Sequence, residues 1–126
     1  MTEYRFSKRA RLLSGGEFER VFAVRASAAD KMLVVYGAEN GLERPRLGLA
    51  VSRRNGSAAR RNRWKRVLRE VFRLTQHQLP ALDLVCVPRA DAAPDFDQLV
   101  VSFPVLALGI HEKLQRGQRR PRPGEP

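Results

Sequence analysis

The sequence is poor in cysteine, in long apolar runs and in acidic residues, and each shortage excludes a class of protein. A single cysteine, Cys86, excludes an intrachain disulfide, and its place in the apolar run 84–87 predicts a small buried residue. No apolar run approaches the roughly 20 residues that a membrane-spanning helix needs. The first residues also lack the apolar core of a signal peptide. We therefore expect a cytoplasmic protein with no membrane partner.

The shortage of acidic residues leaves the chain strongly cationic. Asp and Glu number 13 against 24 Lys and Arg, which gives a net charge of +11 and a pI near 11.3. So many like charges repel one another, and proteins with such an excess usually bind a polyanion. Nucleic acid is the first candidate, and an anionic membrane is a weaker second. The length of 126 residues predicts one domain, over 1–115, and a disordered basic tail over 116–126.

Recognisable catalytic groups are also scarce. His77 and His111 do not sit in a metal-ligand spacing, and no nucleophile motif or phosphate-binding glycine loop is present. Asp95 and Asp97 could hold magnesium, but a role at the start of a helix is favoured. We therefore expect no catalytic residue and no metal ligand on the protein itself.

The first half of the sequence predicts a helix followed by strands. Ser14 and Glu17 have the spacing of a capping box, which predicts a helix over about 14–24. Residues 31–37 and 46–53 are predicted strands, joined by a turn that contains Asn40-Gly41 and expected to pair antiparallel. In the second strand, bulky residues alternate with small ones (Leu47, Leu49 and Val51 against Gly48, Ala50 and Ser52). One face should therefore be core, whereas the other leaves room for a close approach.

The second half predicts a long helix, a buried strand and a last helix. The apolar stripe of the long helix covers about 58–78, and residues 83–88 form a strand apolar on both faces. The last helix is expected over about 102–115. Proline fits only in a first turn, so Pro104 disfavours a continuous helix across 101–104. We expect an α+β sandwich in the order α-β-β-β-α-β-α, with helices packed on a central mixed sheet of about four strands.

The segment 53–73 is the most informative part of the sequence. It contains nine cationic residues and one acid, Glu70; the cations are Arg53, Arg54, Arg60, Arg61, Arg63, Lys65, Arg66, Arg69 and Arg73. At about 100° per residue, one arc of the helix collects Asn62, Lys65, Arg66, Arg69 and Arg73, with Arg63 beside it. Like charges at this spacing cost a few tenths of a kcal/mol per pair. A solvated helix face usually mixes signs, so the pattern favours docking onto phosphates, which arginine grips bidentately.

Three aromatic residues are candidates for binding single-stranded RNA. Unpaired bases stack on flat side chains, and Phe18, Phe22 and Tyr36 could supply them. The alternative is ordinary core packing. That alternative is favoured for Phe22, and the two interpretations are balanced for Phe18 and Tyr36.

The segment 61–73, RNRWKRVLREVFR, resembles the RNR signature of the bacterial ribonuclease P protein family. Three further segments are similar to the family's elements at the expected places: RLGLAVSRR over 46–54, EFERVF over 17–22 and LVVY over 33–36. The similarity covers roughly residues 5–114. It implies a left-handed crossover around the long helix, although sequence reasoning alone would predict a right-handed one.

The resemblance also implies a function. Family members bind a catalytic RNA and, with it, remove the 5′ leader of precursor tRNA, while the RNA carries the active site and its Mg²⁺. By motif, the contacts to the catalytic RNA would be Arg61, Asn62, Arg63, Lys65, Arg66 and Arg69. The leader cleft would be lined or flanked by Phe18, Phe22, Tyr36, Arg53 and Arg54. Pro88 departs from the family near a small cleft-lining position at the end of the last strand. Because proline lacks a backbone donor, leader contacts at that strand are expected to differ.

Two other functions stay open at this stage. A ribosomal or general structural RNA-binding protein would also use basic tails and arginine helices, but would need no cleft for a single strand. A stand-alone metal-dependent nuclease would cleave without an added RNA subunit. Cleavage assays on precursor tRNA, with and without the catalytic RNA, separate the three functions.

Overall fold

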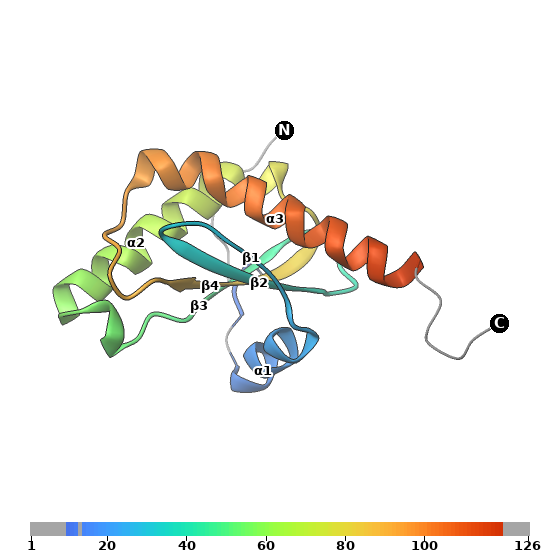
Figure 1. Ribbon diagram of the computed structural model, residues 1–126, viewed down its shortest axis with the longest axis horizontal. Coiled ribbons are helices and arrows are strands. Elements are labelled where there is room, and N and C mark those ends of the chain that lie inside the picture. Colours follow the sequence, from blue (N-terminus) through green and yellow to red (C-terminus); the bar gives the residue numbers. More distant parts are fainter. Residues whose placement is uncertain (1–9, 13, 120–126) are drawn as a thin grey trace.

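The computed structural model describes residues 10–12 and 14–119, and within them three α-helices pack on a four-stranded sheet (Figure 1). The elements follow in the order α1 (Gly15–Val24), β1 (Ala26–Ala29), β2 (Leu33–Glu39), β3 (Arg46–Leu49), the 3-10 turn η2 (Arg53–Asn55), α2 (Ala58–Thr75), the 3-10 turn η3 (Gln76–Gln78), β4 (Leu82–Pro88) and α3 (Phe96–Arg119). The predicted α+β order is therefore confirmed.

The sheet places β4 in its interior, in the order β1-β2-β4-β3. β2 pairs antiparallel with both β1 and β4, whereas β3 pairs parallel with β4. The expected pairing of 31–37 with 46–53 is therefore wrong, because the strand that is apolar on both faces separates them. β3 also ends at Leu49, earlier than predicted. α2 connects the parallel strands β3 and β4, and the left-handedness of that crossover stays a prediction.

The two faces of the sheet are covered differently. α2 and α3 lie on one face and α1 on the other (Figure 1). The main core lies under α2 and α3; its fully buried members include Leu33, Val35, Leu84, Cys86, Trp64, Leu68, Val71, Phe72, Phe103 and Ile110. Cys86 is buried there as expected, and burial raises the pKa of its thiol. A smaller cluster joins α1 to the opposite face around Val21 and Val85.

α3 is longer than predicted. It runs without a break through Pro104, which is buried, and it continues to Arg119. The expected boundaries at 102 and 115 are wrong, and residues 116–119 are helical rather than part of a tail. Burial of Leu99, Phe103 and Ile110 at helical spacing outweighs the roughly 3 kcal/mol that an interior proline costs. Residues 120–126 of the predicted tail lie outside the described residues.

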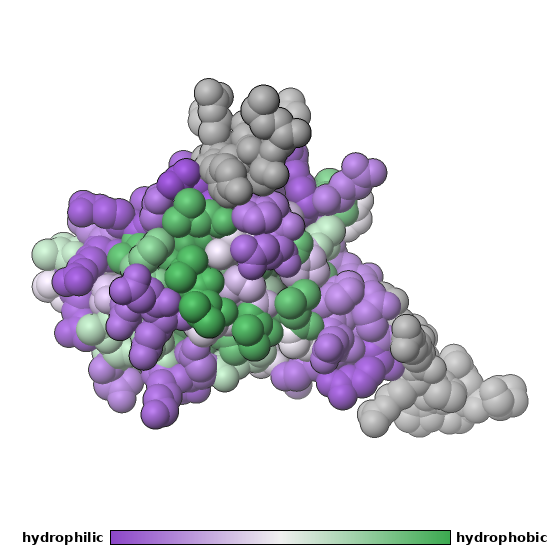
Figure 2. All heavy atoms as spheres, turned by 90° about the horizontal axis from the view of Figure 1, so that it is seen from above, coloured by the Kyte–Doolittle hydropathy of each residue, from purple (hydrophilic) through white to green (hydrophobic). Residues whose placement is uncertain are grey.

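The outer face of α3 is apolar and carries little charge. Figure 2, seen from above Figure 1, shows apolar side chains gathered over this helix. Val101 is 69% exposed and Val105 65%. The sequence contains no Lys or Arg between 96 and 112. None of the helices in the described part of the chain combines the length and apolarity that crossing a membrane requires.

Candidate nucleic-acid interface

The start of α2 is fixed by a short polar turn. Asn55 is buried, and its Nδ2 donates to the carbonyl oxygen of Pro88 at 3.0 Å, while its Oδ1 accepts from Ser52 N at 3.0 Å. Gly56 follows with φ of 103°, a conformation that favours glycine. Ser57 then caps the helix, its Oγ accepting from Arg60 N at 3.2 Å. These contacts fix the first turn of α2 beside the end of β4.

The solvent side of α2 is the cationic face that the sequence predicts. Its exposed members are Asn62, Arg63, Arg66 and Arg69, with Lys65 half-buried beside them. The opposite side of the helix is core, with Trp64, Leu68 and Val71 buried. Burial of the apolar stripe therefore holds the guanidinium groups outward, where they can meet a polyanion.

Arg73 and Arg61 of α2 depart from a fully free cationic face. Arg73 donates to both carboxylate oxygens of Glu70, at 3.1 and 2.5 Å. This hydrogen-bonded pair lowers the pKa of Glu70 and raises the pKa of Arg73. Arg61 is half-buried, and its Nε finds no hydrogen-bond partner among the described residues. The uncompensated charge on the exposed face is therefore centred on 63–69.

On the other side of the sheet, α1 covers only part of the central strand. Side chains alternate along a strand, so Asp83, Val85 and Val87 of β4 point toward α1. Val21 packs with Val85 in the small cluster on this face, and Asp83 pairs with α1 through Arg20. Val87 is half-buried and lines a groove beyond the helix. The end of β4 near Val87 is the part that stays accessible.

The three candidate aromatics lie at the border of this accessible face. Phe18 is half-buried against Gly48, where an added Cβ would lie 2.9 Å from the Phe18 ring. The face of β3 that carries the small residue Gly48 therefore accommodates an aromatic ring. The alternation of bulky and small residues predicted room for such a close approach. Phe22 is 37% exposed and meets Tyr36 edge to face, with ring centroids 5.0 Å apart. Core packing, the favoured interpretation for Phe22, is therefore wrong.

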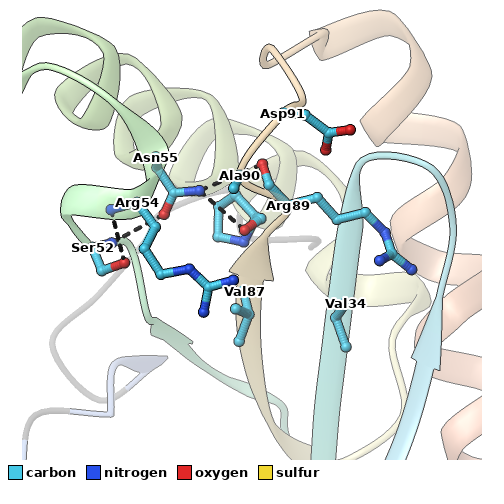
Figure 3. A pocket seen from close by; sticks show the side chains of 9 residues that line it. Val34, Ser52, Arg54, Asn55, Val87, Arg89, Ala90 and Asp91 are labelled. Atoms are coloured by element: carbon cyan, nitrogen blue, oxygen red, sulfur yellow. Dashed lines mark hydrogen bonds between the residues drawn. The ribbon is translucent and has the colours of Figure 1, made fainter.

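A groove of about 320 Å³ lies beyond these aromatics, between η2 and the ends of β2 and β4 (Figure 3). Val34 and Val87 form its apolar part. The side chains of Arg54 and Arg89 lie on its two sides in Figure 3. Arg53, the other predicted cation of this region, is exposed in the same turn η2. The groove combines apolar strand surface with guanidinium groups, which suits an extended single strand.

A second groove, of about 280 Å³, connects the two predicted RNA-contacting regions. Phe18 lines it together with Leu47 and Leu49 of β3 and with Lys65 and Arg69 of α2. The structure thus brings the cationic face of α2 next to Phe18 of α1, around the edge strand of the sheet. Sequence reasoning placed these residues in two separate sites.

Two buried polar residues near these grooves, Asn55 and Asp83, were not among the residues singled out from the sequence. Asp83 is fully buried, and a lone acid within an apolar strand signals cationic partners, because an unpaired buried charge is costly. The described residues contain no cluster of three His, Cys, Asp or Glu side chains placed to hold a metal ion. Asp95 instead caps α3, its Oδ1 accepting from Gln98 N at 3.2 Å.

Comparison with known proteins places this geometry in a family. Residues 6–107 match the family described as Ribonuclease P. The chain is 41% identical over 119 residues to the Ribonuclease P protein component of Salmonella paratyphi A, covering 93% of this chain and 99% of that protein. It is 40% identical over 119 residues to the protein of the same name from Escherichia coli O139:H28, with the same two shares covered.

Solved structures give the same result. The structure of the Staphylococcus aureus RNase P protein superposes with a TM-score of 0.70 at 30% identity, covering 82% of this chain and 95% of that one. The RNase P protein from Thermotoga maritima gives 0.59 at 32% identity, covering 84% and 92%. Sequence and fold therefore point to the same set of relatives.

Proposed function

The chain belongs to the ribonuclease P protein family, and from this premise we propose that it is the protein subunit of a ribonucleoprotein endoribonuclease. In this role it binds a catalytic RNA and the single-stranded 5′ leader of precursor tRNA, and it promotes removal of the leader to give the mature 5′ end. The observation that carries the proposal is the juxtaposition of an exposed arginine face on α2 with an open aromatic face beside α1.

The cationic face of α2 is proposed to bind the catalytic RNA. The contacts are Arg61, Asn62, Arg63, Lys65, Arg66 and Arg69. Exposed guanidinium groups suit phosphates, because their planar donors match phosphate oxygens in pairs. Arg61 has a half-buried stem, so its contact would use the outer part of the guanidinium. Neutralisation by RNA would also relieve the repulsion among these like charges.

The face beside α1 is proposed to hold the leader. Phe22 and Tyr36 offer a partly exposed aromatic pair, and Phe18 borders the same surface. Arg53 and Arg54 would meet leader phosphates where the strand runs past η2. Pro88 lines this groove without a backbone N–H to offer the leader, and its carbonyl oxygen already accepts from Asn55.

Chemistry is proposed to belong to the RNA and its Mg²⁺ ions, which would activate water and stabilise charge at the scissile phosphate. The protein would position substrate and neutralise charge. Three of its acids already have partners: Asp83 pairs with arginines, Asp95 caps the start of α3 and Glu70 pairs with Arg73.

Cleavage assays on precursor tRNA test the proposal. The protein alone should not cleave, the catalytic RNA of a related bacterium should cleave slowly at low magnesium, and the two together should cleave fast at the mature 5′ end. Cleavage by the protein alone would identify a stand-alone nuclease. RNA binding without any stimulation of cleavage would instead favour a structural RNA-binding protein.

A further inference from the structure

Asp83 is a fully buried carboxylate at the centre of an ion-pair network. Arg46 holds it bidentately, with Nε donating to Oδ1 and Nη2 to Oδ2, each at 2.7 Å. Asn40 Nδ2 donates to Oδ1 at 3.0 Å. Arg20 supplies a further donor to Oδ2. A carboxylate with no exposed surface needs this set of donors, because burial removes the water that would otherwise solvate its charge.

The network reaches α1 at two points on one face of the helix. Arg20 joins α1 to Asp83, and its Nη1 also donates to the carbonyl oxygen of Glu39 at 3.0 Å. Glu17 accepts from Arg46 at 3.0 Å through Oε2, while its Oε1 accepts from Ser14 N in the capping box. Residues 17 and 20 are one turn apart, so both links act on the same side of α1.

The aromatic residues lie elsewhere on the same short helix. Phe18 packs over Gly48, and Phe22 contacts Tyr36. Among the α1 residues described, only Val21 is fully buried. This sparse apolar packing, in which Phe18 and Phe22 are only partly covered, holds the helix on the sheet but leaves its rotation about its own axis without a directional constraint. The directional bonds of Arg20 and Glu17 supply this missing constraint.

Three side chains of β4 lie on the α1 side of the sheet, and each has a different environment. Asp83 holds the ion pairs, Val85 packs with Val21, and Val87 lines the groove between Arg54 and Arg89. α1 is therefore anchored near the start of β4, whereas the groove lies at the end of the same strand.

We propose that the Asp83–Arg20–Arg46 network is a positioning device for the substrate leader, setting the rotation of α1 so that Phe18 and Phe22 face a single strand. The residues act through α1 and do not touch the leader themselves. The inference rests on the proposed function, because it assumes that the aromatics of α1 bind the leader.

A double-mutant cycle on the assembled holoenzyme tests the device. Arg20→Gln removes a link to α1, whereas the buried Asp83 keeps Arg46 and Asn40 as partners, so this variant is expected to fold. Arg20→Gln should weaken precursor-tRNA binding by about tenfold, in the range of one lost base–aromatic stacking contact. Affinities for mature tRNA and for the catalytic RNA should stay within about twofold. Arg20→Lys, which keeps a charged donor for Asp83, should recover much of the loss.

The matched control is Arg25→Asn, which removes one exposed charge from the end of the same helix at φ of 61°, where asparagine is tolerated. It should change precursor-tRNA binding by less than about twofold. The second arm of the cycle is Phe22→Ala. In a background that already carries Arg20→Gln, this substitution should add little, because residues that act as a unit are not additive.

Each outcome has a distinct meaning. Additive losses from Arg20→Gln and Phe22→Ala would show that the two residues act independently, and would overturn the positioning role. If Arg20→Gln weakened the binding of precursor and mature tRNA equally, the network would contribute only to general stability. That result would also overturn the positioning role. If Phe22→Ala weakens precursor binding and Arg20→Gln does not, the inference alone is wrong. If neither Phe18→Ala nor Phe22→Ala has an effect, the proposed leader site is wrong, and this inference with it.

Discussion

Arginine, rather than lysine, supplies most of the positive charge on the exposed face of α2. Arg63, Arg66 and Arg69 are exposed there, while their neighbours on the opposite side are buried. A guanidinium forms paired hydrogen bonds to phosphate and stacks on bases, whereas an ammonium acts as a point charge. Each exposed arginine is therefore expected to contribute separately to binding of the catalytic RNA.

The first prediction concerns Arg63 and Arg66. Either one changed to alanine should weaken binding of the catalytic RNA by about 1–3 kcal/mol, the range for hydrogen bonds to charged groups. A filter-binding titration measures the effect. Arg44→Ala, an exposed arginine between β2 and β3, removes the same charge far from α2 along the chain and should change affinity much less. Unchanged affinity in both α2 variants would reject their assignment.

The second prediction concerns Phe18, whose ring is half-buried over Gly48. Phe18→Ala should weaken binding of precursor tRNA to the holoenzyme by about 1–3 kcal/mol, the range for a lost stacking surface. Mature tRNA has no leader, so its affinity should be unchanged. Titrations with both substrates measure the difference, and an equal fall in both affinities would count against a leader contact.

At the scale of elements, the turn between β3 and α2 is held by a single buried amide. Asn55 bridges Ser52 N and the carbonyl oxygen of Pro88, so it ties the start of α2 to the end of β4. Asn55 also lines the groove shown in Figure 3.

The third prediction follows from that bridge. Asn55→Ala should lower the free energy of unfolding by about 1–3 kcal/mol, because it leaves buried polar groups without partners. Asn62→Ala, which changes an exposed asparagine in the neighbouring helix, should stay within about 0.5 kcal/mol. Urea denaturation compares the two variants, and an equal stability of both would contradict the bridging role.

Elements with local signals were predictable from the sequence, whereas their arrangement was not. Residues close together in the sequence define the capping box of Ser14 and Glu17 and the apolar stripe around Trp64. The position of β4 between β2 and β3 depends on contacts between residues far apart in the sequence. Pro104 shows the same limit, because tertiary burial overrides a local preference.

The candidate site divides in the same way. The cationic face of α2 could be predicted, because helical periodicity alone separates it from the core. The exposure of Phe22 could not, because it depends on how α1 lies across the sheet. Asp83 is an intermediate case: a lone acid in an apolar strand is visible in the sequence, but its partners Arg20 and Arg46 come from two distant elements.

At the scale of the whole molecule, charge and apolar surface are segregated on neighbouring helices. The exposed face of α2 is cationic, whereas the outer face of α3 exposes Val101, Val105 and Leu108. RNA that binds through phosphates should therefore approach from the side of α2. The net charge of +11 would add long-range attraction in that approach.

The fourth prediction is a steep salt dependence. Each phosphate neutralised by Lys or Arg releases counterions, so the logarithm of the binding constant should fall linearly with the logarithm of salt concentration. Removing one contacting cation, as in Arg66→Ala, should reduce the slope by about one unit. Titrations at several potassium chloride concentrations measure it. A flat dependence would contradict the electrostatic account as a whole.

Site-directed crosslinking tests the central claim most directly. The native Cys86 is buried and the pKa of its thiol is raised, so a photoreactive group can be attached to a single introduced thiol. Ala59→Cys lies on the exposed side of α2, and Val105→Cys lies on the exposed side of α3. The account predicts crosslinks to the catalytic RNA from position 59 and few from position 105. Crosslinks from position 105 with none from position 59 would contradict it.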